Sequence, residues 1–153
     1  MTEEPSGPRP DPRQMSIDEY LRSNTRLDRE RLMAAVRREQ REEDDMVARA
    51  RGTSLLDGML EFDLFLDKHR QWSRWPEVRR LTCDEVFAGH DLETVRQARV
   101  KAQALLGAAE RYGDKAHDRV DPVELREEMR RDHPGFSETS YVAVLMRGMF
   151  LMR

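Results

Sequence analysis

The sequence predicts an all-α protein, a small helical bundle with a long charged N-terminal helix and a disordered N-terminal arm. Three observations support this prediction. Helix start signals recur from residue 16 onward, and the apolar residues that follow most of them keep the spacing of one helix face. The one apolar run that also alternates like a strand, residues 60–66, has no second such run to pair with. At 153 residues, the chain has the size of one domain with an arm.

The composition narrows the classes of function. Charged residues make up 37% of the chain against about 25% in an average protein, so the apolar residues must be concentrated in part of it to form a core. The net charge of −3 argues against a main role in neutralising a phosphate backbone. Because Cys83 is the single cysteine, an intrachain disulfide and a cysteine-rich zinc cluster are excluded. No secretory signal pattern and no apolar run near about 18 residues occur, so we expect a cytoplasmic protein without membrane spans.

The N-terminal residues 1–15 contain four prolines and almost no apolar side chain. Such a segment cannot bury enough surface to offset the entropy lost on ordering, and we predict that it is disordered. Ser16 then stands three residues before Glu19, which is the spacing of a capping box, and Ile17 begins a helical apolar pattern. A helix is therefore expected to start at residue 16.

A long helix is predicted over residues 26–51, which contain no Gly or Pro and consist mostly of good helix formers. Its apolar residues form two patches, separated by residues 37–45, which include none. Because this gap interrupts any coiled-coil seam, we interpret residues 16–51 as a charged helical segment, solvated and held by pairs such as Asp45 with Arg49. The alternative is a charged arm that docks on a partner.

Residues 53–153 are predicted to form the compact helical domain. Its first element is a dense apolar cluster, residues 55–66, which follows a possible helix cap at Ser54. Length and the cap favour a helix over a strand there. Pro76 disfavours helical geometry in the preceding residue, so a corner is expected around it.

Local signals also place the middle of this domain. Thr82 and Glu85 have the capping-box spacing and predict a short helix. Asp91 caps the best amphipathic helix of the chain, whose many alanines permit a close approach of another helix. Residues 113–120 are predicted to be a polar loop.

Two further helices complete the predicted domain. Asp121 as cap, with Pro122 at the first helical position, starts the first of them. The turn at residues 133–135, His-Pro-Gly, ends it, and the last helix is expected over residues 141–152.

The last predicted helix is apolar on nearly every side, so it must be surrounded, either by its own fold or by another chain. One interpretation is a central core helix. The other is a seam for a protein partner or a second copy, because large apolar side chains at the end of the sequence would otherwise be exposed. The residues predicted to make that contact are Tyr141, Leu145, Met149, Phe150 and Met152.

A nucleic-acid site is the first alternative. Tryptophans lie between arginines in residues 68–80, so indole rings can stack on bases while guanidinium groups hold phosphates. We favour the opposing interpretation, in which the rings cover the core and the arginines pair with the acidic residues just before them. The residues of this alternative site are Arg70, Trp72, Arg74, Trp75, Arg79 and Arg80.

An enzyme is the second alternative, and no catalytic, cofactor-binding or metal-binding residue is assigned. Cys83 and His90 are seven residues apart, without an orienting group that the sequence identifies. Asp114 and His117 have the i, i+3 spacing of a carboxylate–imidazole pair, but a di-metal helical bundle needs a second such pair, and a lone pair is typical of a polar loop. The function predicted from the sequence is therefore that of a non-catalytic regulatory or adaptor protein that acts through protein–protein contact.

Overall fold

The computed structural model describes residues 16–23, 29–69 and 80–151. Every regular element in these ranges is a helix, which confirms the all-α prediction. In chain order they are α1 (Ile17–Ser23), α2 (Arg29–Arg51), α3 (Leu55–Lys68), α4 (Cys83–Val86), α5 (Leu92–Gly107), α6 (Ala109–His117), α7 (Pro122–Asp132) and α8 (Glu138–Leu151). The predicted disordered arm, residues 1–15, lies outside the described residues.

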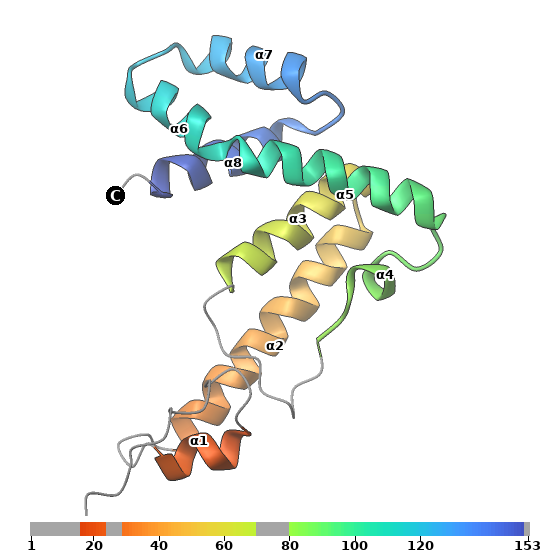
Figure 1. The fold of residues 1–153 in the computed structure, drawn as a ribbon, viewed down its shortest axis with the longest axis vertical. Coiled ribbons are helices and arrows are strands. Elements are labelled where there is room, and N and C mark those ends of the chain that lie inside the picture. The colour runs from red at the N-terminus through yellow and green to blue at the C-terminus, as the bar shows by residue number, and fades with distance from the viewer. Residues whose placement is uncertain (1–15, 24–28, 70–79, 152–153) are drawn as a thin grey trace, which may run out of the picture.

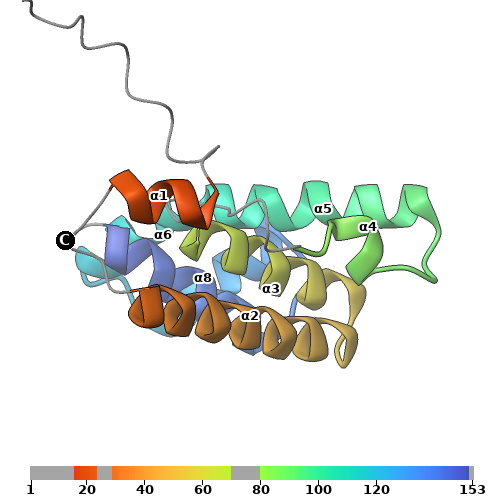
Figure 2. The same cartoon turned by 90° about the horizontal axis from the view of Figure 1, so that it is seen from below.

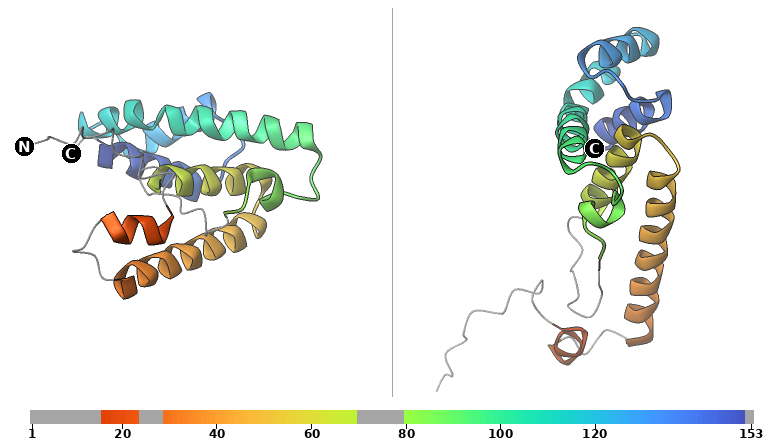
Figure 3. Two further views of the ribbon diagram at one scale, coloured as in Figure 1. Left: turned by 60° about the horizontal axis from the view of Figure 1, so that its bottom comes forward. Right: turned by 90° about the vertical axis from the view of Figure 1, so that its right-hand side faces the viewer.

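The helices are arranged around α3, which lies between α2 and α5 (Figure 2). Helices α6, α7 and α8 gather at one end of the molecule, and α1 lies beside the N-terminal half of α2 at the other end (Figure 1). The views in Figure 3 show the same order, with α8 beside α3 and α6. The main core is formed by the facing sides of all helices from the C-terminal third of α2 onward.

The N-terminal helices form a small cluster of their own. The predicted capping box is present: the Ser16 backbone N–H donates to the Glu19 carboxylate at 2.9 Å, and the Glu19 N–H donates to the Ser16 hydroxyl at 3.1 Å. Ile17 packs on Val36 of α2, with half-buried apolar neighbours from both helices. The first apolar patch of α2 therefore holds α1 rather than the main core.

Helices α2 and α3 form a tight antiparallel hairpin. Ser54 caps α3 by accepting a hydrogen bond from the Asp57 N–H at 3.2 Å. Gly58 of α3 lies against the backbone of Ala50, and a Cβ atom at residue 58 would collide with the Ala50 carbonyl oxygen. The second apolar patch of α2, Met46 to Ala50, enters the main core through this contact.

Helices α4 and α5 begin where the sequence predicts. Thr82 and Glu85 form the complete capping box of α4, and Asp91 caps α5 by accepting from the Thr94 N–H at 3.1 Å. Ala98 and Ala102 are buried where α5 packs on α3. The small side chains of α5 thus permit the close approach that the alanine content predicts.

The predicted polar loop at residues 113–120 is wrong over its first half, because α6 continues to His117. The chain turns at Ala108, which ends α5 and begins α6. Gly113 lies within α6 and meets Gly148 of α8: a Cβ atom at residue 113 would lie 2.5 Å from the Gly148 carbonyl carbon. The two helices cross backbone on backbone at these glycines, and this crossing sets which side of α8 faces outward.

Helix α7 also begins as predicted, with Asp121 as cap and Pro122 in the first turn. Leu125 and Met129 bury its inner face. The turn that follows contains Gly135 at a φ of +101°, a backbone conformation that residues with a Cβ atom rarely adopt. This turn leads directly into α8.

Candidate interaction surface

Helix α8 has an inner and an outer face. Its inner face consists of Ser140, Tyr141, Val144 and Gly148, all buried. On the outer face, the exposed fractions are 42% for Val142, 48% for Met146, 44% for Met149 and 59% for Phe150. These four residues follow an i, i+4, i+7, i+8 spacing and therefore form one strip along the helix.

We call these four residues the α8 strip. Among the described residues, it differs from the other exposed apolar side chains in being contiguous. The other exposed large apolar side chains of the described ranges are Leu92 and Val100 on α5 and Val123 on α7. Single exposed apolar residues are normal on a protein surface, whereas a contiguous strip indicates a contact site. The strip is therefore the candidate interaction surface.

The residues predicted for partner contact differ in their exposure. Met149 and Phe150 are exposed on the strip, and Leu145 is half-buried against the core. Tyr141 is only 1% exposed, and its hydroxyl donates to the His133 carbonyl oxygen at 2.7 Å, so it belongs to the interior. Met152 lies outside the described residues.

Val142 and Met146 complete the strip, and the sequence analysis missed both. The available signal was Gly148: a glycine in a helix of large apolar residues indicates the side where another backbone approaches. Val142 and Met146 lie on the side of α8 away from that contact.

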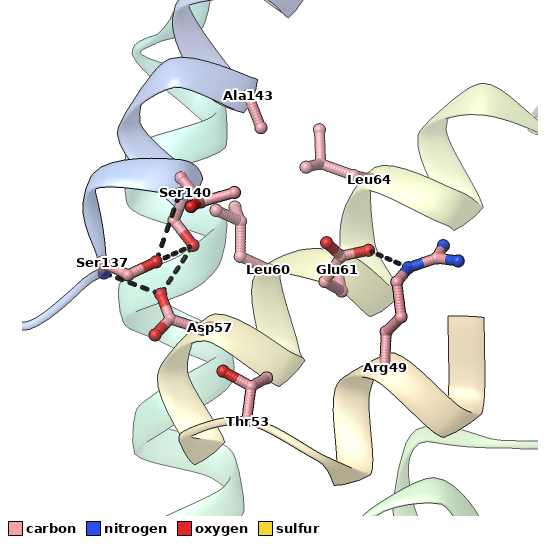
Figure 4. A pocket seen from close by; sticks show the side chains of 10 residues that line it. Arg49, Thr53, Asp57, Leu60, Glu61, Leu64, Ser137, Ser140 and Ala143 are labelled. Carbon is pink, nitrogen blue, oxygen red and sulfur yellow. Dashed lines mark hydrogen bonds and ion pairs between the residues drawn. The ribbon is translucent and has the colours of Figure 1, made fainter. Parts of the chain in front are cut away.

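Two adjoining pockets lie between α3 and the helices on either side of it, and Figure 4 shows the first of them. One pocket of about 210 Å³ lies between the end of α2, α3 and the start of α8, and Leu64 and Ala143 point toward each other across it. A second pocket of about 240 Å³ lies between α2 and α3. The two share Arg49, Glu61 and Leu64, and we call them together the α3 groove.

Carboxylates outnumber basic groups among the charged residues that line the α3 groove. Four of them, from Glu42, Asp45, Asp57 and Glu61, stand against two basic groups, from Arg49 and Lys68, which leaves a formal charge of −2. Arg49 lies 3.5 Å from Glu61, so its ion partner is on α3 and not the predicted Asp45. A hydrogen bond from Lys68 lowers the pKa of Glu42 and outweighs the effect of partial burial.

Asp57 ties the start of α3 to the start of α8. Its carboxylate accepts hydrogen bonds from the Ser137 N–H at 2.8 Å and from the Ser140 hydroxyl at 2.6 Å. The Ser54 hydroxyl donates to its other oxygen at 2.7 Å. Burial alone would raise the pKa of Asp57, but these three donors outweigh it and lower the pKa. Asp57 is therefore ionised at neutral pH, between two helix N-termini that favour a negative charge.

The polar middle of α2 was interpreted from the sequence as a solvated stretch. The structure shows that part of it is buried. Glu39 is only 7% exposed and forms an ion pair with Arg80, which precedes α4. His69, at the end of α3, places its Nδ1 atom 3.9 Å from the same carboxylate and its Nε2 atom 3.2 Å from Glu42. A buried charged cluster on α2 thus holds both residue 69 and residue 80.

This cluster bears on the nucleic-acid alternative. Six residues were predicted for the nucleic-acid site. Five of them lie outside the described residues: Arg70, Trp72, Arg74, Trp75 and Arg79. The sixth, Arg80, is largely buried and paired with Glu39. Its guanidinium group therefore serves the fold and is not presented to a phosphate.

The residues of the enzyme alternative show no catalytic arrangement in the described part of the chain. Cys83 is buried with its Sγ atom 3.6 Å from the Met59 sulfur, and burial raises the pKa of its thiol, whereas His90 is exposed. Asp114 and His117 are both exposed on α6. The described residues contain no group of three or more His, Cys, Asp or Glu side chains placed to hold a metal ion.

One buried carboxyl outside the groove has a strongly shifted pKa. Asp63 of α3 faces α5 and is 6% exposed, and its Oδ1 atom is 4.0 Å from the Arg99 Nε atom, beyond hydrogen-bonding distance. Burial raises the pKa of Asp63 from 3.8 to about 6, against the smaller opposing effect of the Arg99 guanidinium. The Cys83 thiol of α4 also faces this carboxyl.

Replacing Asp63 with asparagine should remove a pH dependence of stability. Because the folded-state pKa of about 6 lies above the ordinary 3.8, ionisation disfavours the folded state. The contribution of Asp63 to the free energy of unfolding is therefore expected to fall by about 1–2 kcal/mol as the pH rises from about 4 to 7, after allowance for solvent screening. Asp63→Asn should lack this fall in urea titrations, whereas Asp44→Asn, at an exposed carboxyl, should retain it. Parallel profiles for Asp63→Asn and wild type would refute the assignment.

No family model, curated protein sequence or solved structure matches the chain. Within the described ranges, no helix is both long enough and apolar enough to cross a bilayer.

Proposed function

We propose that the chain is a non-catalytic regulatory or adaptor protein of the cytoplasm that acts by binding another protein, or a second copy of itself, through the α8 strip. The observation that supports this is the exposure of Val142, Met146, Met149 and Phe150 on one side of a helix whose other side is buried. Two of the four are methionines, whose flexible, polarisable side chains suit an adaptable contact surface.

The support beneath the strip favours the same function. Helix α8 is fixed at its start by the hydrogen bonds to Asp57 and in its last turns by the Gly148 crossing with α6. A strip on a helix held at both ends loses little conformational freedom on binding, so more of the contact energy appears as affinity.

Photocrosslinking tests this proposal in the full chain. A photoreactive phenylalanine analogue at residue 150 is expected to form adducts in the native cell, because this side chain lies in the proposed contact. The matched control carries the same analogue at Val100, which is 67% exposed on α5 and outside the strip. An adduct at twice the 18.0 kDa chain mass would identify a second copy, and other masses a different protein. Equal yields at both positions, or none at residue 150, would contradict the proposal.

A further inference from the structure

We propose that the α3 groove binds a basic amphipathic segment of the partner protein. This inference rests on the proposed function and names the chemistry of the partner. Three features support it: an apolar floor, an acidic lining, and the continuity of the floor with the α8 strip.

The floor of the groove is apolar and leads into the strip. Leu64 of α3 and Ala143 of α8, both half-buried, line it above the buried Leu60. Ala143 is followed at i+3 by Met146 and at i+7 by Phe150, positions that lie on one side of a helix. A bound segment that places apolar side chains on Leu64 and Ala143 therefore reaches the exposed strip with its next turns.

The lining already accepts cations. Lys68 lies 3.0 Å from Glu42, and Arg49 lies 3.5 Å from Glu61. Both basic side chains are more than half exposed, and such surface pairs contribute little free energy, so a partner's cation can compete for the carboxylates. The Asp57 carboxylate already accepts hydrogen bonds from serine hydroxyls and a backbone N–H. The Asp45 side chain is exposed.

Charge also argues against a second copy in this groove. Two chains that meet groove to groove would bring together two linings, each with a formal charge of −2. Like charges across a symmetric contact lower affinity and slow association. The excess of carboxylates instead favours a partner segment rich in lysine or arginine.

Fluorescence anisotropy with two defined probes tests the inference on the full chain. The first is a labelled synthetic peptide of about 16 residues with leucines at i, i+3, i+4 and i+7 spacing and lysines elsewhere. The second has glutamate in place of every lysine. The lysine peptide is expected to bind, with an affinity that falls as salt is raised. The glutamate peptide is expected to bind at least about tenfold more weakly.

Two neighbouring residues give a charge-matched pair of variants. Asp45 lines the groove, whereas Asp44 is exposed on the same helix and does not line it. Asp45→Lys should weaken binding of the lysine peptide about fivefold, because it replaces an attraction with a repulsion. Asp44→Lys carries the same change in net charge and should leave the affinity within about twofold of wild type.

The remaining outcomes separate this inference from the proposed function. If Asp44→Lys and Asp45→Lys act alike while Phe150→Glu abolishes peptide binding, the strip binds and the groove assignment is wrong. If Phe150→Glu also has no effect, neither surface binds the peptide. If ultracentrifugation shows that wild type dimerises and Asp45→Lys does not, the occupant is a second copy and the inference is overturned.

Discussion

Gly148→Ala is expected to lower the free energy of unfolding by about 3 kcal/mol or more. A Cβ atom at residue 148 would overlap the Ala109 carbonyl oxygen and lie 2.7 Å from its carbonyl carbon and 3.1 Å from the Gly113 nitrogen. These are backbone atoms of α6, so no side-chain rotation can relieve the collision, and α8 must separate from α6. Urea denaturation followed by circular dichroism measures the loss.

Gly107 provides the matched control for this substitution. It is also a helical glycine, at the end of α5, and a Cβ atom there would have no neighbour within 4 Å. Gly107→Ala should leave stability unchanged or raise it by up to about 1 kcal/mol, because alanine restricts the unfolded chain. A loss for Gly148→Ala no larger than that for Gly107→Ala would show that α6 and α8 do not cross at these glycines.

Arg80→Met is expected to lower the free energy of unfolding by about 3–5 kcal/mol, because it leaves the Glu39 carboxylate buried without its guanidinium partner. The second replacement, Glu39→Leu, should restore most of this loss in the double variant, since the unpaired charge is then gone. Arg41→Met, at an exposed position on α2, is the control and should change stability by less than about 0.5 kcal/mol. Urea titrations of the three variants supply the comparison.

The loss in Arg80→Met should also depend on pH. Without Arg80, burial raises the folded-state pKa of Glu39 above its unfolded value. Such a group destabilises the folded state as the pH rises through that range, so the difference from wild type should shrink on acidification to about pH 4. A difference that is constant with pH would show that the lost Arg80 contact is one of packing and not of charge.

The local features of the fold could be predicted from the sequence. The caps formed by Ser16, Thr82, Asp91 and Asp121 are all found where expected, because a cap depends on residues within one helical turn. The all-α class follows from these caps and from the apolar spacing between them.

The features that were missed depend on residues far apart in the chain. Gly113 was assigned to a loop because glycine is a poor helix former, whereas in the fold it is the residue of α6 that lets the backbone of Gly148 approach. Glu39 was assigned to a solvated stretch, since its burial depends on Arg80 and His69. Local patterns contain no information about such pairs. The apolar character of α8 predicted that something covers it, but only the crossing at Gly148 separates the inner face from the α8 strip.

The hydrogen bonds that Asp57 accepts have a consequence for the order of folding. Ser137 and Ser140 lie 80 and 83 positions further along the polypeptide, whereas the α2–α3 hairpin closes through residues only a few positions apart. Closing a long loop costs more chain entropy than closing a short one, so we expect the hairpin to form early and the contact of α8 with Asp57 to form late. The glycine crossing of α6 and α8 joins residues 113 and 148, which are closer in the chain, so it can form before the Asp57 contact. Under the proposed function, the position of the α8 strip relative to α3 is therefore the last feature of the contact surface to be fixed.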